Sequence, residues 1–212
     1  MRPVVTASVT LGLATGVFAI SFGVGAVSAG ASVAQTCAMS LLVFTGATQF
    51  SAVSVIGAGG STLAALGGGL LLAARNGVYG LTMARRLPGS LRRRLVAAQL
   101  TLDESTAMAA GQSDPAAQRA AFWITGVSVY VFWNLGTLIG ALVGRAIDPT
   151  TFGLDAAFPA AFVAMLWPML RDRRSRAVAL CGAVLCVVSI PLVPVGVPLL
   201  FAALAVLIGV PR

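Results

Sequence analysis

The sequence predicts an all-α, polytopic integral membrane protein, folded as a single transmembrane domain over residues 1–212. Of its 212 residues, 58% are hydrophobic and only 9% are charged, and the mean hydropathy is +0.95. A water-soluble domain of this size needs far more polar surface than these residues supply. A spanning helix takes ~20 apolar residues, so the chain has room for about seven to eight hydrophobic helices and little else.

Continuous apolar windows give the expected helices in order. They lie at 7–29, 36–57, 61–83, 95–111, 121–144, 153–170, 177–192 and 195–210. None alternates polar and apolar residues in the way that the short strands of a membrane β-barrel do. The first window follows Arg2, but it is too long and too rich in glycine for the apolar region of a signal peptide. We therefore expect it to remain as a packed span.

The formal charge of +8 comes from fourteen arginines and no lysine against six acids. Most arginines fall in two clusters, at 85–94 and 171–176, as in the cytoplasmic loops of helical membrane proteins. No folded basic surface is expected, so nucleic acid is excluded as a partner and the lipid bilayer is favoured.

The two arginine clusters conflict with eight full spans. If every window crosses, three of them separate the clusters and place them on opposite faces, whereas positive loops should share one face. We therefore expect one intervening window to be broken or re-entrant, either 95–111 or the stretch that ends at Pro168. Irregular backbone at membrane depth survives only beside protein or a water-filled cavity, so the conflict also predicts a cavity.

Small residues and prolines predict how the helices meet. Gly136, Gly140 and Gly144 form a ridge, and Gly12 and Gly16 form a shorter one, which allow close helix packing inside the subunit or against a partner. Prolines at 191, 194 and 198 separate the last two windows, so interrupted helices are expected there, either as binding features or as inert kinks.

Charged side chains inside apolar windows are the main functional candidates, because each costs at least ~2.5–3.5 kcal/mol to insert. Arg75 lies deep in one window and is followed by Asn76 and Tyr79. Asp103 and Glu104 lie in the middle of another, and Asp155 opens a third.

Helical spacing in 95–111 places Gln99, Asp103 and Thr106 on one stripe. Two adjacent acids near an arginine in a low dielectric would allow one acid to keep its proton and take part in proton coupling. The alternative is an ion pair between Arg75 and either acid that only locks the helices together. Both interpretations stay open.

In 36–57, the spacing places Thr45, Thr48 and Gln49 on one helical face. Such a stripe is typical of a polar lining, and equally of hydrogen bonds that hold neighbouring helices together.

Absent residue types exclude several kinds of chemistry. The sequence has no histidine and no lysine, which removes Ser-His-Asp triads, HExxH zinc sites and Walker A loops. Its three cysteines form no CxxC motif. We expect no enzyme activity, no cofactor and no metal site.

Five segments in order resemble the AzlC family, the large subunit of branched-chain amino acid exporters. They are SFGVGA, MSLLVFTGATQFSA, AARNGVYG, LTLDESTAMA and GLDAAFPAAF. The resemblance implies export of small apolar amino acids, a small AzlD-like membrane subunit as partner, and a bacterial cytoplasmic (inner) membrane location. Gln49, Asp103, Glu104 and Asp155 match the family pattern. Where the family commonly has Asn, Ala, Arg, His, this chain reads AARN at 73–76, so only the arginine and Tyr79 are kept.

A zwitterion with an apolar side chain needs a cation or helix N-terminus, an acid and an apolar pocket. We expect Arg75 to bind the carboxylate, and Asp103 or Glu104 to bind the ammonium group or a coupling proton. Gln49 and Thr45 are expected to line the site, and the remaining substrate-binding candidates are Tyr79, Asn76 and Asp155. The alternative function is a non-transporting structural or assembly subunit that uses these charges to dock a partner.

Overall fold

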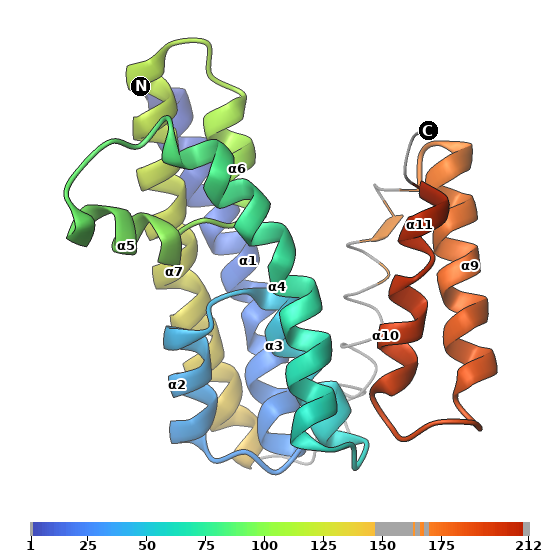
Figure 1. Ribbon diagram of the computed structural model, residues 1–212. Helices are drawn as coiled ribbons and strands as arrows, with labels where there is room; N and C mark the ends of the chain where they lie inside the picture. The colour runs from blue at the N-terminus through green and yellow to red at the C-terminus, as the bar shows by residue number, and fades with distance from the viewer. Residues whose placement is uncertain (1, 147–162, 164–165, 168–169, 210–212) are drawn as a thin grey trace.

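The computed structural model describes residues 2–146, 163, 166–167 and 170–209, and every regular element in those ranges is a helix (Figure 1). This agrees with the predicted all-α class. Most of the window 153–170 and the candidate Asp155 lie outside the described residues.

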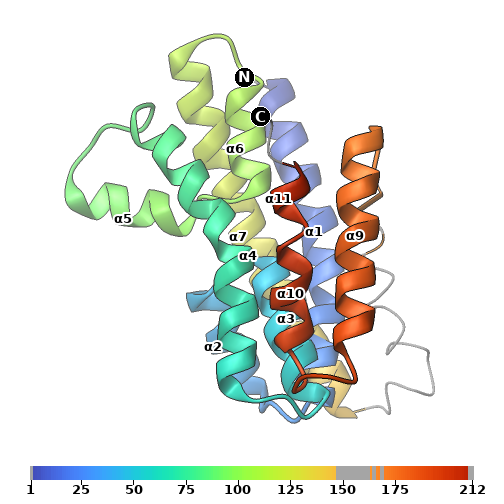
Figure 2. The same ribbon diagram turned by 45° about the vertical axis from the view of Figure 1, so that its right-hand side comes forward.

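Two long helices lie side by side along the molecule, α1 (Arg2–Ser28) and α7 (Pro115–Ala146) (Figures 1 and 2). They cover the windows predicted at 7–29 and 121–144 and extend beyond them. Within the described ranges, these two helices are long and apolar enough to cross a membrane, judged by length and composition. The total of seven to eight hydrophobic helices stays a prediction.

The α1–α7 contact depends on the glycines that the sequence singled out. A Cβ atom at Gly136 would overlap the Gly16 carbonyl, and one at Gly140 would overlap the Ile20 carbonyl. At Gly144 it would lie 2.9 Å from the Val24 Cα atom. The glycine ridge therefore packs inside the subunit, where the backbones approach closely enough to gain dispersion contacts that lipid does not provide.

The exterior of the molecule is apolar, and buried polar side chains lie within its core. Large aliphatic side chains point outwards, with Leu63, Leu81 and Val17 exposed by 81%, 76% and 70%. Inside, Ser8 on α1 and Thr125 on α7 are fully buried and share a hydrogen bond of 2.8 Å between their hydroxyl oxygens. An apolar exterior over a hydrogen-bonded polar interior is the arrangement that lipid as a solvent favours.

The window predicted as one helix over 36–57 is two helices, α2 (Val33–Leu42) and α3 (Gly46–Gly57). Phe44 in the break has a positive φ of 34°, a conformation that is costly for a bulky residue. Its ring is 2% exposed and packs edge-on against Tyr130 on α7, with 4.7 Å between the ring centroids. The single-helix prediction was wrong here because tertiary packing, which periodicity does not report, holds the break open.

The window predicted over 95–111 is also interrupted, as the arginine clusters required. It forms α5 (Leu91–Gln99) and α6 (Asp103–Ala110) with a short break between them. The Ser105 hydroxyl accepts a hydrogen bond from the Leu102 N–H at 3.0 Å and donates one to the Leu100 carbonyl at 2.6 Å. Backbone groups that leave the helix are thus satisfied within the segment itself.

The break explains how both arginine clusters reach one end of the molecule. α4 (Thr62–Ala84) ends, and α7 begins, towards the end that holds the N-terminus, so α5 and α6 do not cross the bundle (Figures 1 and 2). α9 (Arg173–Ser189) begins towards that same end. Its N-cap residue, Asp172, accepts hydrogen bonds from Ser175, which lower the pKa of this carboxyl group.

The last two windows are interrupted as the prolines predicted, and the second is divided again. α9 is followed by α10 (Val197–Ala203) and α11 (Val206–Gly209). Leu200 and Leu199 on α10 face Gly67 and Gly68 on α4, where a Cβ atom would be in ordinary van der Waals contact with each leucine. This contact joins the C-terminal helices to the rest of the structure.

The glycine contacts predict that substitution by alanine lowers the stability of the fold at one site and raises it at another. Gly140→Ala forces α1 away from α7 and should cost ~1–3 kcal/mol, as overpacking does. Gly77→Ala, at a helical site with no atom within 4 Å of the added Cβ, should stabilise by ~0.5–1 kcal/mol. Thermal unfolding in detergent micelles measures both, and shifts of the same sign would contradict the packing described.

Candidate functional site

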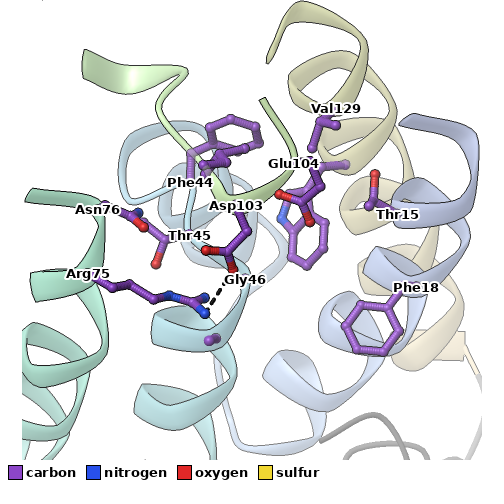
Figure 3. Close-up of a pocket in the computed structure, with 13 residues that line it drawn as sticks. Thr15, Phe18, Phe44, Thr45, Gly46, Arg75, Asn76, Asp103, Glu104 and Val129 are labelled. Atoms are coloured by element: carbon purple, nitrogen blue, oxygen red, sulfur yellow. Dashed lines mark ion pairs between the residues drawn. The ribbon is translucent and has the colours of Figure 1, made fainter. Parts of the chain in front are cut away.

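The two helix breaks meet at a cavity of about 270 Å³ in the middle of the molecule (Figure 3). Its walls come from α1, the α2–α3 break, α4, the start of α6 and α7. The lining residues are Thr15, Phe18, Phe44, Thr45, Gly46, Ala47, Arg75, Asn76, Leu102, Asp103, Glu104, Val129 and Trp133. The helix that follows each break, α3 or α6, therefore has its N-terminal end at this cavity.

The start of α3 offers backbone donors to this cavity. Gly46 and Ala47 begin the helix, and the N-cap residue Thr45 does not bond to them through its side chain. Trp133 lies against Gly46, where a Cβ atom would come within 2.8 Å of the indole ring. The first turn of a helix carries free N–H groups and a partial positive charge, so this end of the cavity favours an anion.

Arg75 on α4 forms an ion pair with Asp103 at the start of α6, with 2.8 Å between Nη1 and Oδ2 (Figure 3). The two side chains are 31% and 34% exposed. One further atom of each group is unpaired, because the buried Arg75 Nε and Asp103 Oδ1 have no hydrogen-bond partner among the residues that the structure describes. The ion pair that the sequence raised as an alternative therefore exists, but it leaves unused hydrogen-bonding capacity at the cavity.

Glu104 follows Asp103 at the start of α6 and lines the cavity beside it, further from Arg75 and on the side towards Thr15 (Figure 3). It takes part in no ion pair among the described residues. The cavity therefore holds one arginine and two carboxylates, and one negative charge has no cation when both acids are ionised. In an apolar medium such a charge favours the entry of a cationic group.

The remaining wall is aromatic and aliphatic. Phe18, Phe44, Val129 and Trp133 line it, and the Trp133 ring also packs against Phe18, with 6.2 Å between ring centroids. A cavity with charges on one side and apolar rings on the other fits a small amphipathic molecule. In the described part of the chain, no three His, Cys, Asp or Glu side chains gather where they could hold a metal ion.

The structure brings most of the predicted residues together. Arg75, Asn76, Asp103, Glu104 and Thr45 all line the cavity. Tyr79 lies outside the lining, although it is close enough to Asp103 to interact with it electrostatically.

The predicted stripe of Thr45, Thr48 and Gln49 was wrong, because Thr45 caps α3 in an extended conformation. Thr48 donates a hydrogen bond to the Gly69 carbonyl at 3.2 Å, so it joins α3 to α4. Gln49 is fully buried and does not line the cavity, contrary to our expectation.

Gln99 has a structural role that the sequence did not reveal. The predicted stripe with Asp103 and Thr106 was wrong, because the break places Gln99 on α5 and the other two on α6. Its amide nitrogen donates to the Leu41 and Leu42 carbonyls at 2.9 Å and 3.3 Å. Gln99 thus connects the second interrupted segment to the end of α2, next to the first break.

The aromatic wall was also missed. Phe18, Phe44 and Trp133 come from three separate windows, and aromatic residues in apolar windows are as often oriented towards lipid as towards a cavity. Nothing in their spacing distinguished them.

Fold and cavity together define a helical membrane protein in which two interrupted helices enclose a charged, partly apolar site. The chain belongs to the family described as AzlC protein, whose family model matches residues 10–147. It is 25% identical over 190 residues to the "Branched-chain amino acid transport protein AzlC" of Bacillus subtilis, covering 89% of this chain and 72% of that protein. An "Uncharacterized membrane protein" of Helicobacter pylori is 26% identical over 175 residues, covering 82% of this chain and 77% of the relative. No solved structure matches.

These relationships support a role in transport and a place in the membrane, and they argue against an enzyme. The chain spans at least two thirds of the length of both relatives.

Charge reversal tests whether the Arg75–Asp103 pair only locks α4 to α6. Arg75→Asp or Asp103→Arg alone places like charges together, so each should lower the yield of folded protein, and the double variant should recover it. A coupling energy of about 1 kcal/mol is expected for a pair that is one-third exposed. We expect transport to stay low in the folded double variant, because the charges have exchanged places relative to the α3 N-terminus. Recovery of transport together with folding would make the pair a structural lock.

Proposed function

We propose that the protein is a transporter subunit that exports branched-chain or similar small apolar amino acids from a bacterial cell through its cytoplasmic membrane. The observation that carries this proposal is the division of the cavity. On its polar side Thr45 Oγ1, Arg75 Nε and Asp103 Oδ1 are buried without partners, and on its other side lie Phe18, Val129 and Trp133. Buried polar atoms without partners are costly, so a ligand that supplies the missing hydrogen bonds is strongly favoured.

The substrate carboxylate is assigned to the start of α3 and to Arg75. The amides at Gly46 and Ala47 have no side-chain cap and lie at the cavity wall, and Arg75, which also lines the cavity, has a buried Nε without a partner in the described part of the chain. Interrupted helices in transporters place their N-termini against anionic groups in the same way. This changes the expected role of Arg75, which shares the carboxylate with backbone donors because Asp103 occupies its Nη1 atom.

The substrate ammonium group is assigned to Glu104, which lines the cavity and has no ion pair within the described ranges. A zwitterion placed between Glu104 and the α3 N-terminus adds one positive and one negative charge, so both ends find partners without disturbing Arg75 and Asp103. The apolar side chain then contacts Phe18, Val129 and Trp133. A cavity of about 270 Å³ lies near the lower limit for small-molecule sites, ~300–1,000 Å³, which favours a small substrate.

A proton gradient or another ion gradient is the proposed driving force. The cavity lining holds two adjacent carboxylates and one arginine. A proton on one of the two carboxylates therefore removes the negative charge that has no cation. The site would release that proton when it opens to one side of the membrane and take one up when it opens to the other. The charge of the site would then depend on the side to which it opens. The Bacillus subtilis relative, a branched-chain amino acid transport protein, supports the substrate class. A small AzlD-like membrane subunit is the proposed partner.

Reconstitution tests the proposal. Proteoliposomes with and without the small partner should move labelled valine or leucine, and Arg75→Gln or Glu104→Gln should reduce the rate roughly ten- to a hundredfold. That range corresponds to the loss of one hydrogen bond to a charged group, ~1.5–3 kcal/mol. Arg145→Gln, an exposed residue at the end of α7, is the matched control and should transport normally.

Normal efflux of valine by well-folded Arg75→Gln and Glu104→Gln would refute the site. The absence of transport by the native chain, with or without its partner, would instead favour the alternative of a structural or assembly subunit.

A further inference from the structure

A second hollow, of about 310 Å³, lies between the end of α4 and α5, and its lining shares no residue with that of the cavity in Figure 3. Two helix faces form its walls. α4 contributes Gly80, Met83, Ala84 and the following Leu87, and α5 contributes Leu91, Arg94, Leu95 and Ala98. Leu91, Arg94, Leu95 and Ala98 have the i, i+3, i+4, i+7 spacing of one face of α5, and Gly80, Met83 and Ala84 have the i, i+3, i+4 spacing of one face of α4. The hollow is therefore a groove between two mainly apolar helix faces.

The groove has one free cation and otherwise apolar walls. Met83 and Leu87 form its base, with 3% and 6% of their surfaces exposed. Besides Arg94, the polar side chain among the lining residues is Thr101, and its hydroxyl already donates to the Ala97 carbonyl at 2.7 Å. At Gly80 an added Cβ would find no atom within 4 Å, so the groove is open along the α4 side.

Arg94 also differs from its neighbour in what it contacts. Arg93 turns back onto the bundle, where its guanidinium lies 5.6 Å from the centroid of the Trp123 ring. Arg94 has no ion pair among the described residues, and the sequence from 76 to 102 contains no acid at all. The arginines at 85, 86, 92 and 94 therefore give this side of α4 and α5 an uncompensated positive charge.

The orientation of α5 completes the argument. It runs across the direction of the long helices, on the side of the molecule that carries the arginine clusters (Figures 1 and 2). Leu91, Leu95 and Val96 are exposed by 71%, 62% and 52%, although arginines stand between them. A short helix with exposed leucines, a row of arginines and this orientation is typical of one that lies in the headgroup region of a bilayer.

From these observations we propose that the α4–α5 groove is a binding site for an anionic phospholipid, with an acyl chain between the two apolar faces and the headgroup phosphate at Arg94. An acyl chain can pack against the eight apolar lining residues, whereas a small soluble anion would make no contact with most of them. The uncompensated positive charge selects an anionic headgroup over a zwitterionic one. This site does not depend on the proposed substrate or on the direction of transport.

Native mass spectrometry of the purified full-length chain tests the proposal, with phosphatidylglycerol and phosphatidylcholine of identical acyl chains as probes. We expect phosphatidylglycerol to be retained about fivefold more strongly, the contribution of one arginine near an anionic lipid. Arg94→Gln should remove this preference by removing the cation. Gly80→Leu should remove it by filling the groove while every arginine stays in place.

Matched controls separate the groove from general surface charge. Gly77→Leu adds the same side chain to α4 at an equally open position outside the groove, and Arg145→Gln removes an arginine at the opposite end of α7. Both should keep the preference. Leu95→Gln, on the exposed α5 wall, is the second groove variant if Gly80→Leu does not fold.

Four results would overturn the proposal. The first is equal retention of both lipids by the native chain. The second is loss of the phosphatidylglycerol preference in Arg94→Gln while the folded groove variants keep it, which would mean that surface arginines attract the lipid without a groove. The third is equal competition by inorganic phosphate, which would indicate a free-anion site. The fourth is complete displacement of lipid by a bound protein subunit, which would make the groove a protein interface.

Discussion

Two interrupted helices meet inside a molecule whose exterior is apolar, so every backbone group released at the interruptions must find a hydrogen-bond partner within the protein. Three side chains meet most of this demand. Gln99 and Tyr130 donate to the Leu41 carbonyl at the end of α2, and Ser105 bonds to the Leu102 N–H and Leu100 carbonyl in the second break. The amides at the start of α3 are left without a side-chain cap, and they face the cavity. The donors at this end of the cavity are thus backbone N–H groups to which no side chain of the protein provides a cap.

This arrangement depends on the close packing of α1 and α7. Because glycines bring the two backbones together, Phe18 and Phe22 on α1 reach the ring of Trp133 on α7, and Trp133 reaches Gly46 at the start of α3. Gly126 on α7 receives Leu100 of the second break in a similar way, since a Cβ there would lie 2.9 Å from the leucine Cβ. The two breaks are therefore held against one rigid pair, and the cavity lies between fixed and interrupted elements.

The sequence predicted the site better than the backbone around it. Arg75, Asp103 and Glu104 were identifiable because a charge in an apolar window is costly and needs a reason. The interruption at 100–102 was foreseen because two arginine clusters had to share a face. The break at Phe44 was not foreseen, because the residues around it include no proline and no charge. The buried Phe44 ring packs against Tyr130 at this break. Once that break was missed, Thr45, Thr48 and Gln49 were wrongly placed on one face.

Charge balance is the reason why the substrate proposed above is a zwitterion and not a simple ion. Arg75 and Asp103 already neutralise one another at 2.8 Å, so a free anion would meet Glu104 across the cavity and a free cation would face the N-terminus of α3. A molecule with both charges avoids either repulsion, and its two charged groups must be close together to fit about 270 Å³. α-Amino acids have this geometry, with carboxylate and ammonium on one carbon. In the function proposed above, the aromatic wall accounts for a preference for apolar side chains, because a polar side chain placed against Phe18 and Trp133 would lose its hydrogen bonds without replacement.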